Sequence, residues 1–459
     1  MPLTGKNAGD MDHRASPPGP FPLRTRLAAL AGRSLARLSR RAGRGSGSVV
    51  GGHAILAIDR SALARLAAGR ETFLVSGTNG KTTTTKLVAA AVSPTGHVVT
   101  NVLGANLPSG LATALASGPR GAPAVLEVDE AWLPRVATQL GPSVMALLNL
   151  SRDQLDRNNE VRQVAQRWRQ ACQEASPSLV VVANADDPLV AWAASGAKRV
   201  IWVGAGLRWK ADATGCPACG GQVVFAGASD SPLRLEDEPL AGWSCSECGL
   251  CRPHLDVLLD WRPGGGHSAI VVHGTRHRLS IGLPGRCNAA NAAMALAAVA
   301  ASGRDAEAAL VAMARVRDVA GRYATVKVGR ASARLLLAKN PAGWAEVFDM
   351  LSPPPAPVVV AINARTADGH DPSWLWDVPF EQLRDRFVVS TGERGLDLAV
   401  RLHYAEVPHA YVPGLHQAVE AAANNPGSRA PGGPDPGVIE VLANYTAFHQ
   451  LLSMTGRRP

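Results

Sequence analysis

Short, uninterrupted apolar runs alternate with helix-like stretches along most of the chain. In the first half, these runs lie at residues 72–76, 124–128, 144–150, 178–184 and 199–204. Strands that are buried on both faces read as continuous hydrophobic runs, and helices between them imply that the strands pair in parallel. The pattern therefore predicts an α/β protein whose first sheet is mostly parallel.

A second α/β series begins near residue 326, and a different kind of segment interrupts the first series. The later apolar runs lie at residues 332–338, 356–363, 386–391 and 437–444. Residues 211–253 have weak periodicity and two pairs of Cys, which is typical of an inserted small module. The expected organisation is an N-terminal segment, a first domain that contains the insertion, and a second domain, at residues 1–50, 51–325 and 326–459.

The N-terminal segment is rich in Pro, Gly, Arg and Ser, so we expect it to be partly flexible. It ends in the turn-prone "GRGSGSVVGG", residues 43–52. Within it, the leucine and alanine spacing of residues 27–38 predicts a short amphipathic helix. Two docking surfaces fit such a helix, namely the body of the protein or a membrane surface.

Charge and composition limit which classes of partner and which cellular location we expect. The chain has 459 residues, of which 46% are hydrophobic and 18% charged, so it is globular. Its formal charge of +10 is concentrated in residues 24–44 and carried by Arg, with seven Lys in all. Such a bias is more typical of genome composition than of nucleic-acid binding, and we expect no nucleic acid partner. Because no long apolar span or signal-peptide core is present, the predicted location is the cytoplasm.

The stretch "VSGTNGKTTTT", residues 75–85, predicts a nucleotide site. It follows an apolar run and opens a helix-like segment, so its backbone N–H groups would face an anion at a helix N-terminus. Lys81 would reach the terminal phosphates of ATP, and the Thr82 hydroxyl would bind Mg²⁺. The first glycine is Gly77, two positions later than in the common P-loop pattern. The predicted phosphate-binding residues are Gly77, Thr78, Asn79, Gly80, Lys81, Thr82 and Thr83.

Glu127 lies inside the apolar run "AVLEV" and is the predicted acidic partner of this loop. A buried carboxylate is unfavourable without a cation, and the carboxyl edge of an open α/β sheet is where ligands bind. We therefore predict that Glu127 binds Mg²⁺ and takes part in catalysis. Asp129 and Glu130 fit a ligand role and a helix-capping role equally well.

Four cysteines predict a structural zinc site. The pairs "CPACG" and "CSECG" have the spacing C-x2-C-x25-C-x2-C, with a glycine after each pair. Thiolates in this pattern are typical of a zinc ribbon, and four protein ligands leave no open position for catalysis. The predicted zinc ligands are Cys216, Cys219, Cys245 and Cys248, while Cys251 reads as a spare thiol.

Several ordered stretches resemble the signatures of the Mur ligase superfamily. They are "GTNGKTTT" (77–84), "LNLSRDQLDRNN" (148–159), "NADDP" (184–188), "NAANAAMALAA" (288–298) and "VAGRY" (319–323). The resemblance implies that ATP phosphorylates a carboxylate and that an amine then attacks the acyl phosphate. It also implies that Asn288 or Asn291 contacts adenine and that Arg322 contacts the nucleotide. Asp153 and Asp156 are expected, by the same resemblance, near the edge of the sheet. Without the family, both Asn residues fit helix capping.

The chain also departs from ordinary Mur ligases. Several of them carry a carbamoylated lysine that binds a second Mg²⁺, whereas this chain has no Lys between Lys86 and Lys198, and Arg167 or Trp168 stands at that place. The cysteine insertion is the second departure. With the C-terminal stretches "LAKNPAGWAEV" (337–347), "NARTADGHDPSWLWD" (363–377) and "TGERGLDLAVRLHYA" (391–405), the chain resembles the MurT family, the synthetase subunits of lipid II isoglutaminyl synthases.

That resemblance implies a Rossmann-like C-terminal domain that contacts a GatD-like glutamine amidotransferase subunit. The heterodimer would amidate the α-carboxylate of D-glutamate in lipid II during peptidoglycan biosynthesis, at the inner face of the cell membrane. An aspartate of "ADGHDPSWLWD" would complete the partner's Cys–His pair, with Asp371 preferred, Asp368 second and Asp377 in a local role. From the residues alone, this stretch reads as a turn with a buried Trp pair.

The residues also indicate that the ammonia is made elsewhere. A glutaminase nucleophile needs a Cys on a tight Gly-rich turn beside a His, and neither Cys172 nor Cys287 has that context. Two alternatives stay open. A conventional Mur or folylpolyglutamate-type ligase is disfavoured by the missing lysine and the ribbon, and a zinc-ribbon nucleic-acid-binding NTPase by the acidic "RLEDE" (234–238).

Overall fold

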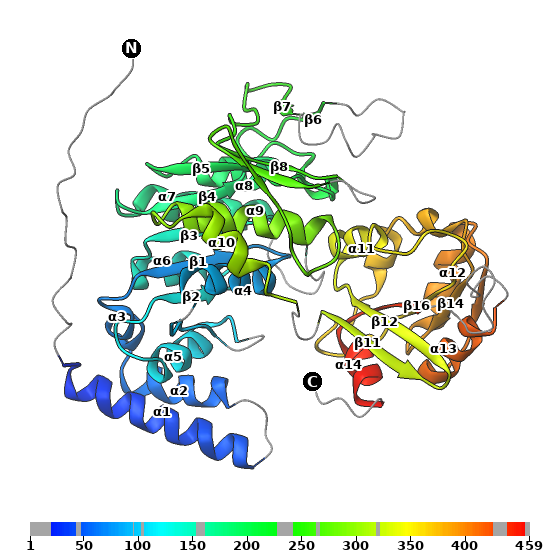
Figure 1. Ribbon diagram of the computed structural model, residues 1–459, viewed down its shortest axis with the longest axis horizontal. Helices are drawn as coiled ribbons and strands as arrows, with labels where there is room; N and C mark the ends of the chain where they lie inside the picture. The colour runs from blue at the N-terminus through cyan, green and yellow to red at the C-terminus, as the bar shows by residue number, and fades with distance from the viewer. Residues whose placement is uncertain are drawn as a thin grey trace.

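The computed structural model describes residues 20–42, 47–94, 96–101, 105–152, 161–226, 242–262, 267–317, 322–425 and 438–454. These residues form two α/β units, one around an eight-stranded sheet and one around a six-stranded sheet. The units lie side by side, with the C-terminal one (yellow to red) on the right of Figure 1. The α/β class predicted from the apolar runs is confirmed.

The first sheet has the strand order β10-β9-β8-β5-β4-β3-β1-β2. The pairs from β2 to β8 are parallel, and β9 and β10 extend the sheet as antiparallel strands. The apolar runs predict β1 to β5 but not this antiparallel edge, whose β10 reads "TRHR" and has little apolar character. The strands are β1 (Thr72–Ser76), β2 (Ala124–Glu127), β3 (Val144–Leu147), β4 (Val180–Asn184), β5 (Val200–Gly204), β8 (Val257–Asp260), β9 (Ala269–Val272) and β10 (Thr275–Arg278).

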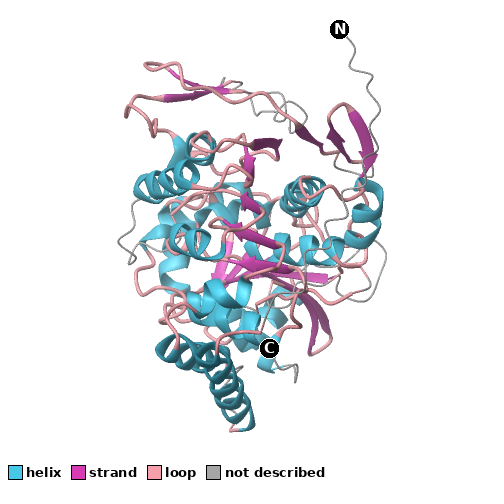
Figure 2. Cartoon of the chain, turned by 90° about the vertical axis from the view of Figure 1, so that its left-hand side faces the viewer, coloured by secondary structure: helices cyan, strands magenta, loops and turns pink. Residues whose placement is uncertain are grey.

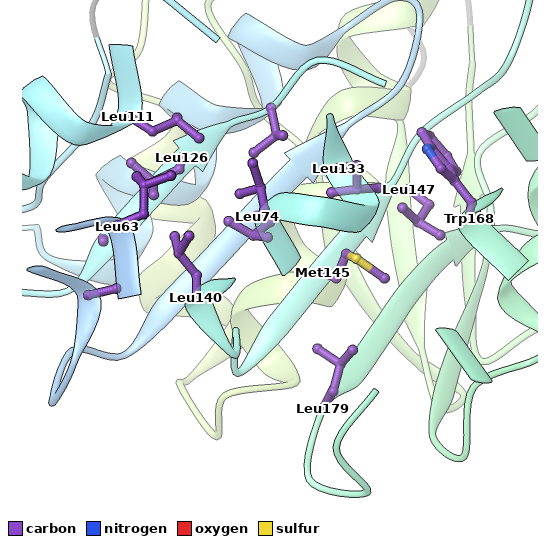
Figure 3. Packing of buried hydrophobic residues seen from close by; sticks show 14 of the residues in the cluster. Leu63, Leu74, Leu111, Leu126, Leu133, Leu140, Met145, Leu147, Trp168 and Leu179 are labelled. Atoms are coloured by element: carbon purple, nitrogen blue, oxygen red, sulfur yellow. The ribbon is translucent and has the colours of Figure 1, made fainter. Parts of the chain in front are cut away.

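Helices cover both faces of this sheet, because its strands alternate their side chains between two cores. Leu74 points into the core drawn in Figure 3, with Met145 and Trp168, whereas Phe73 belongs to the opposite core. In Figure 2 the strands run between layers of helices. One layer contains α3 (Ala62–Ala67), α5 (Pro108–Ser117), α6 (Leu133–Leu140), α7 (Val161–Glu174) and α8 (Pro188–Ala194), and the other α4 (Lys81–Val92), α9 (Arg286–Ala300) and α10 (Ala306–Met313).

Two N-terminal helices, α1 (Leu23–Arg41) and α2 (Ser48–Ile58), add a layer outside α5. The amphipathic helix predicted at 27–38 is confirmed as part of α1. The turn predicted at its end is partly wrong, because residues 48–52 begin α2. Their glycines allow close helix contact: a Cβ on Gly52 would lie 1.7 Å from the Ser109 carbonyl oxygen. Within the described residues, no helix has both the length and the apolar character to cross a membrane.

A small module is inserted between β5 and β8. It contains the turn η1 (Ala211–Ala213) and the antiparallel strands β6 (Val223–Phe225) and β7 (Trp243–Cys245). Trp243 is buried, and its indole N–H donates to the backbone oxygen of Ala185 at 2.9 Å. This bond attaches the module to the end of β4, so the insertion is part of the first unit.

The second sheet has the order β11-β12-β16-β13-β14-β15 and is parallel except for β11. Its strands are β11 (Tyr323–Val328), β12 (Ala331–Leu337), β13 (Val358–Ala361), β14 (Val388–Thr391), β15 (His409–Tyr411) and β16 (Val438–Ala443). Around them lie α11 (Pro341–Phe348), η2 (Ser373–Trp376), η3 (Phe380–Leu383), α12 (Gly395–Tyr404), α13 (Leu415–Ala423) and α14 (Tyr445–Met454). The exact division at residues 50 and 325 stays a prediction.

Candidate active site

The phosphate loop joins β1 to α4 at the carboxyl edge of the first sheet. Gly77 and Gly80 both have positive φ, 148° and 87°, a backbone conformation that favours glycine. At Gly80 space is also short, because an added Cβ would lie 2.3 Å from Oδ1 of Asn291. The structure thus places residues 77–83 in one strand–turn–helix unit, and α4 begins at Lys81 rather than near Thr83.

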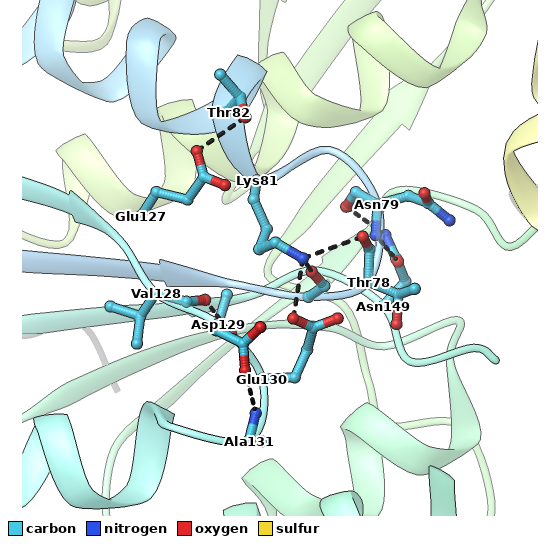
Figure 4. A network of polar contacts seen from close by, with 12 residues as sticks. Thr78, Asn79, Lys81, Thr82, Glu127, Val128, Asp129, Glu130, Ala131 and Asn149 are labelled. Atoms are coloured by element: carbon cyan, nitrogen blue, oxygen red, sulfur yellow. Dashed lines mark hydrogen bonds and ion pairs between the residues drawn. The ribbon is translucent and has the colours of Figure 1, made fainter. Parts of the chain in front are cut away.

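The Lys81 ammonium group lies inside this loop (Figure 4). Its Nζ donates to the backbone oxygens of Gly77 at 2.5 Å and Thr78 at 3.1 Å, and pairs with Oε2 of Glu130 at 2.9 Å. The side chains of Lys81 and Glu130 are only 10% and 15% exposed. A cation buried this deeply needs an anion beside it. A phosphate group that enters the loop would therefore have to replace one of these contacts to reach the lysine.

Thr82 and Glu127 form a second polar pair, on the other side of the loop (Figure 4). The Thr82 hydroxyl donates to Oε2 of Glu127 at 2.8 Å. Glu127 ends β2, and Asn101 fixes its backbone through bonds of 2.9 Å to both its N–H and its carbonyl oxygen. A hydroxyl and a carboxylate at this distance are oxygen ligands of the kind Mg²⁺ prefers. The pair fits a magnesium ion.

The side chain of Asn149, which follows β3, forms hydrogen bonds with the backbone of the phosphate loop. Its Oδ1 accepts the Asn79 N–H at 2.8 Å, and its Nδ2 donates to the Asn79 carbonyl oxygen at 3.0 Å. The Thr78 hydroxyl donates to the Ser151 backbone oxygen at 3.0 Å. Asn149 belongs to the stretch 148–159 that resembles a Mur ligase signature, but the sequence pattern did not indicate this contact with the loop. Asp153 and Asp156, expected near the sheet edge, lie outside the described residues.

Glu130 is the ion partner of Lys81, which the sequence left open between a ligand role and helix capping. The N-terminus of α6 has no side-chain cap, so capping is wrong for this residue. Trp168 positions the turn, because its indole N–H donates to the Glu130 backbone oxygen at 2.9 Å. Trp168 is one of the two residues predicted to stand in place of the missing lysine. It is fully buried, whereas Arg167 is exposed.

The predicted adenine and nucleotide residues lie beside the loop. Asn291 contacts Gly80 and accepts the Thr84 hydroxyl at 3.3 Å, and Asn288 donates to the Tyr323 hydroxyl at 3.1 Å. Neither caps α9, whose N-cap is Gly285 without a side-chain bond, so the capping interpretation is wrong. Tyr323 is a neighbour that sequence reasoning missed.

A cleft of about 120 Å³ lies between these residues and the second unit. Across it, the side-chain amide of Asn79 donates to Oδ1 of Asn340 at 3.2 Å, and Asn340 caps the N-terminus of α11. The cleft therefore lies between the two units and has polar groups at its walls. The predicted residues Asn79, Gly80, Thr83, Asn288, Asn291 and Arg322 line it together with Gly343 and Glu346 of α11.

The four predicted cysteines form one cluster. Their sulfur atoms all lie within 4.8 Å of one another, and the closest pairs are Cys219–Cys245 at 3.5 Å and Cys216–Cys248 at 3.6 Å. Tetrahedral zinc places its thiolate sulfurs about 3.8 Å apart, so the cluster fits zinc. Cys251 is not a member of this cluster.

The backbone around the cysteines favours thiolates. The N–H groups of Gly221 and Glu247 donate to the sulfurs of Cys219 and Cys245 at 3.3 and 3.4 Å. The bond from Glu247, with one from Cys248, lowers the pKa of Cys245 to about 7, whereas hydrogen bonds with neighbouring thiols help to raise the pKa of Cys219 and Cys248. Metal binding requires deprotonated sulfur, so the backbone bonds agree with a metal ligand set.

The two aspartates proposed for the partner's active site have different surroundings. Asp368 is only 6% exposed, accepts the Thr446 N–H at 2.9 Å and also accepts the Thr446 hydroxyl. Asp371 is exposed and accepts the Ser373 N–H at 2.8 Å at the start of η2. That backbone bond, with the Ser373 side chain, holds the pKa of Asp371 below its usual range. Asp377 pairs with Arg152 of the first unit at 3.5 Å, so the local role expected for Asp377 is wrong.

The remaining thiols of the described interior do not suit nucleophilic chemistry. Burial raises the pKa of Cys172 to about 12 and also raises the pKa of Cys287. A thiol attacks as the thiolate, so both would be unreactive at neutral pH.

Comparison with known proteins shows the family to which the chain belongs. A protein of Streptococcus pneumoniae named "Lipid II isoglutaminyl synthase (glutamine-hydrolyzing) subunit MurT" is 31% identical over 457 residues, which cover 94% of this chain and 97% of that one. The chain belongs to the MurT family. A MurT subunit of Staphylococcus aureus is 27% identical, over 81% of this chain and 87% of its own. Two family models also match, "MurT ligase C-terminal" at residues 337–448 and "Mur ligase middle domain" at 75–212.

Solved structures agree with the fold of a MurT chain. A pseudomurein peptide ligase type C from Methanothermus fervidus has a TM-score of 0.62 at 18% identity, over 84% of this chain and 79% of that one. Folylpolyglutamate synthase of Mycobacterium tuberculosis has a TM-score of 0.56 at 16% identity, over 95% of each chain. At these identities the likeness concerns the fold alone.

Membership of the MurT family identifies the chain as a ligase. Its Mur ligase middle domain implies the use of ATP and Mg²⁺, and this domain contains the phosphate loop, Glu127 and Glu130. The loop and the Thr82–Glu127 pair are therefore compatible with the cofactors that the family implies.

Proposed function

We propose that this chain is the synthetase subunit of an enzyme that amidates lipid II, using ATP and ammonia supplied by a glutaminase subunit. The observation that carries the proposal is the phosphate loop, which holds the Lys81–Glu130 and Thr82–Glu127 pairs and whose Asn79, Gly80 and Thr83 line a cleft between two units, in a chain of the MurT family. The pneumococcal relative bears the name of a glutamine-hydrolysing lipid II isoglutaminyl synthase subunit, which supports both the substrate and the partner.

The proposed chemistry activates a carboxylate that would otherwise resist an amine. An oxygen of the D-glutamate α-carboxylate attacks the γ-phosphorus of ATP, and the bond to the bridging oxygen breaks to release ADP. Ammonia then attacks the acyl carbon, loses a proton and expels phosphate, which leaves the amide of D-isoglutamine. Both steps concentrate negative charge near the loop, where charge neutralisation lowers the barrier.

Lys81 is the residue of this chain that would neutralise the transferred phosphoryl group. In the structure it is held by Glu130 and two backbone oxygens. Contact with phosphate would replace part of this set, and Glu130 would keep the ammonium aligned. Mg²⁺ held by Thr82 and Glu127 would supply further charge neutralisation. Asn288, Asn291 and Arg322, which line the same cleft, are proposed to hold the nucleotide.

The proposed glutaminase contact lies on the second unit, beside Asp371. Along α12, Leu396, Val400 and Tyr404 are 62%, 51% and 69% exposed and recur every fourth residue. Trp376, which is 55% exposed, has its ring 5.6 Å from that of Tyr404. Large apolar side chains gathered in this way are typical of protein interfaces, where Trp and Tyr carry much of the binding energy.

We call Trp376, Leu396, Val400 and Tyr404 the aromatic-leucine patch. Its Trp376 belongs to η2, at whose start Asp371 accepts the Ser373 N–H. Asp371 is exposed, and its pKa lies below its usual range, so the carboxylate is ionised at neutral pH. An ionised carboxylate beside a docking surface suits a residue that orients a histidine of the docked subunit. We therefore propose that Asp371 completes the partner's Cys–His pair and that residues 326–459 form the partner-binding domain.

We also propose that the four-cysteine cluster binds structural zinc. The purified chain should contain about one zinc per molecule, as expected for four thiolate ligands. Cys216→Ser should lose this zinc and unfold at a lower temperature, whereas Cys251→Ser should keep it. Equal zinc content in the two variants would contradict the ligand set.

The decisive experiment is an amidation assay on lipid II with the purified chain and its glutaminase partner, in the presence of ATP, Mg²⁺ and glutamine. Mass spectrometry should show the loss of about one mass unit that accompanies replacement of a carboxylate oxygen by nitrogen, with one ADP formed per amide. Addition of an amino acid to a nucleotide-linked precursor, without amidation of lipid II, would instead indicate a conventional Mur ligase. A matched reaction with ammonium chloride in place of glutamine separates the synthetase step from ammonia supply.

A further inference from the structure

Helix α1 carries its large apolar residues outward. Its buried face consists of small residues, including Ala28, Gly32 and Ala36, which pack on α2. The leucines face solvent instead, and Leu23, Leu27, Leu30 and Leu38 are 68%, 53%, 53% and 59% exposed. Amphipathic surface helices normally bury the stripe of large apolar residues. The outward stripe therefore has no function in the core of this protein.

Arginines follow one edge of this leucine stripe. Helix α1 contains six Arg and no acidic residue. Four of them, Arg26, Arg33, Arg37 and Arg40, recur at steps of seven, four and three, so they share one side of the helix. Arg26, Arg37 and Arg40 are exposed. The outward surface of α1 thus combines an apolar stripe with a basic border.

A basic groove adjoins the same helix. It encloses about 470 Å³ and is lined by Leu30 of the stripe and by Arg26, Arg33, Arg70 and Arg120, with no carboxylate among its lining residues. Arg70 is buried and already donates to the backbone oxygens of Leu66, Pro119 and Ala122, so it adds positive charge to the groove rather than a donor for a ligand. The summed positive charge around the groove attracts anionic groups such as phosphates. The groove therefore extends the basic border away from the leucines.

The inner side of α1 is fixed to the body of the protein. The Thr25 hydroxyl donates to Asp59 at 2.6 Å, and Arg24 donates to the Ile58 backbone oxygen at 2.5 Å. Asp59 also pairs with Arg65 at 3.0 Å. The helix is therefore held by polar bonds and small residues, and its outward face is available without any loss of these contacts.

We propose that α1 binds the surface of a bilayer that contains anionic phospholipids, with Leu23, Leu27, Leu30 and Leu38 among the acyl chains and the arginines at the lipid phosphates. Charge complementarity favours this occupant, because leucines and arginines in one helix face match the apolar and anionic layers of such a membrane. A second copy of the chain would bring the arginines of two helices together, which is repulsive. The inference does not depend on the proposed amidation reaction.

The test is flotation of the full chain with vesicles of phosphatidylcholine alone or of phosphatidylcholine with phosphatidylglycerol. We expect binding to the anionic vesicles that weakens as salt is added, since exposed charge pairs are screened. Arg26→Gln with Arg37→Gln and Arg40→Gln should weaken it about a hundredfold, because each arginine near an anionic surface strengthens binding about fivefold. Leu27→Asn with Leu30→Asn and Leu38→Asn should weaken it at least about tenfold.

The matched control is Val311→Asn with Val438→Asn and Met454→Asn, three exposed apolar residues elsewhere, which should leave vesicle binding unchanged. All variants should keep the thermal unfolding midpoint of the parent chain and its activity on detergent-solubilised substrate. The proposal would be overturned by equal binding of the parent and the leucine variant. It would also be overturned if the leucine variant only converted a dimer to a monomer in sedimentation, because the stripe would then bind a second copy.

Discussion

The phosphate loop and the surface around Asp371 differ in how far their charged groups are buried and paired. In the loop, the Lys81 side chain is 10% exposed, and its ammonium group pairs with Glu130 of the same chain. On the second unit, Asp371 is exposed and accepts the Ser373 N–H, while Trp376 and Tyr404, which pack on each other, expose more than half of their surface.

The difference distinguishes a site that is complete within the chain from one that is not. Buried charge in the loop is already paired, so its ligand must replace existing contacts. The rings of Trp376 and Tyr404 pack on each other but still expose more than half of their surface, and burial of that surface would contribute favourably to association with another chain. We therefore expect changes in the loop to affect every reaction of the enzyme, and changes around Asp371 to affect only reactions that need the glutaminase.

Removal of the loop lysine should have the largest effect. Lys81→Ala deletes the buried cation that would meet the transferred phosphoryl group, and we expect ATP turnover to fall about 10⁴-fold. Steady-state release of ADP, with ammonium chloride as nitrogen source, measures this. Lys86→Ala, one turn later in α4, is the control and should keep near-normal turnover. If Lys81→Ala lost activity with glutamine but kept it with ammonium chloride, the assignment of Lys81 would be contradicted.

The two aspartates of the second unit should separate next. Asp371→Asn removes an exposed carboxylate, so we expect glutamine-dependent amidation to fall about 10³-fold while ammonium-dependent amidation is kept. Asp368→Asn instead disturbs the bonds to Thr446 and should lower the unfolding temperature and both activities together. If Asp368→Asn were the variant that lost only the glutamine reaction, Asp368 would take the role proposed for Asp371.

The aromatic-leucine patch should control association rather than chemistry. Trp376→Ala with Tyr404→Ala should weaken binding of the glutaminase subunit about a hundredfold, since exposed aromatic anchors at interfaces contribute about 2 kcal/mol or more. Isothermal titration with the purified partner measures this. Val438→Ala with Met454→Ala changes two other exposed apolar residues and should not alter the affinity. Unchanged affinity of the aromatic variant would remove the patch from the interface.

The sequence predicted the loop region better than the partner surface, and the reason is local geometry. Gly77, Gly80 and Lys81 are neighbours in sequence, so their spacing already indicates their function. The Cys pairs carry a similar local signal, and all four came together as expected. By contrast, Glu130 meets Lys81, and Trp168 meets Glu130, only because β1, β2 and α7 pack against one another, and no short pattern encodes that packing.

The N-terminal helices show the converse problem. The pattern "SVVGG" reads as a turn because glycine favours turns. In the fold, Gly51 and Gly52 allow α2 to approach α1 and α5, where a Cβ would overlap backbone atoms. Such a contact depends on helices that are distant in sequence. The pattern of α1 likewise predicts which residues share a face of the helix, but not that the leucine face points to solvent.

The hydrogen bond from Trp168 to Glu130 should give the smallest effect and the finest test of the comparison. Trp168→Phe keeps a buried ring but removes the indole N–H that holds the Glu130 backbone at 2.9 Å. One such bond contributes about 1 kcal/mol, so we expect catalytic efficiency for ATP to fall about fivefold. Trp192→Phe in the neighbouring α8 is the control. Because the loop serves both nitrogen sources, the loss must be equal with glutamine and with ammonium chloride. A loss confined to glutamine would mean that the loop and the partner surface are coupled, and the distinction between a complete site and an incomplete one would not hold.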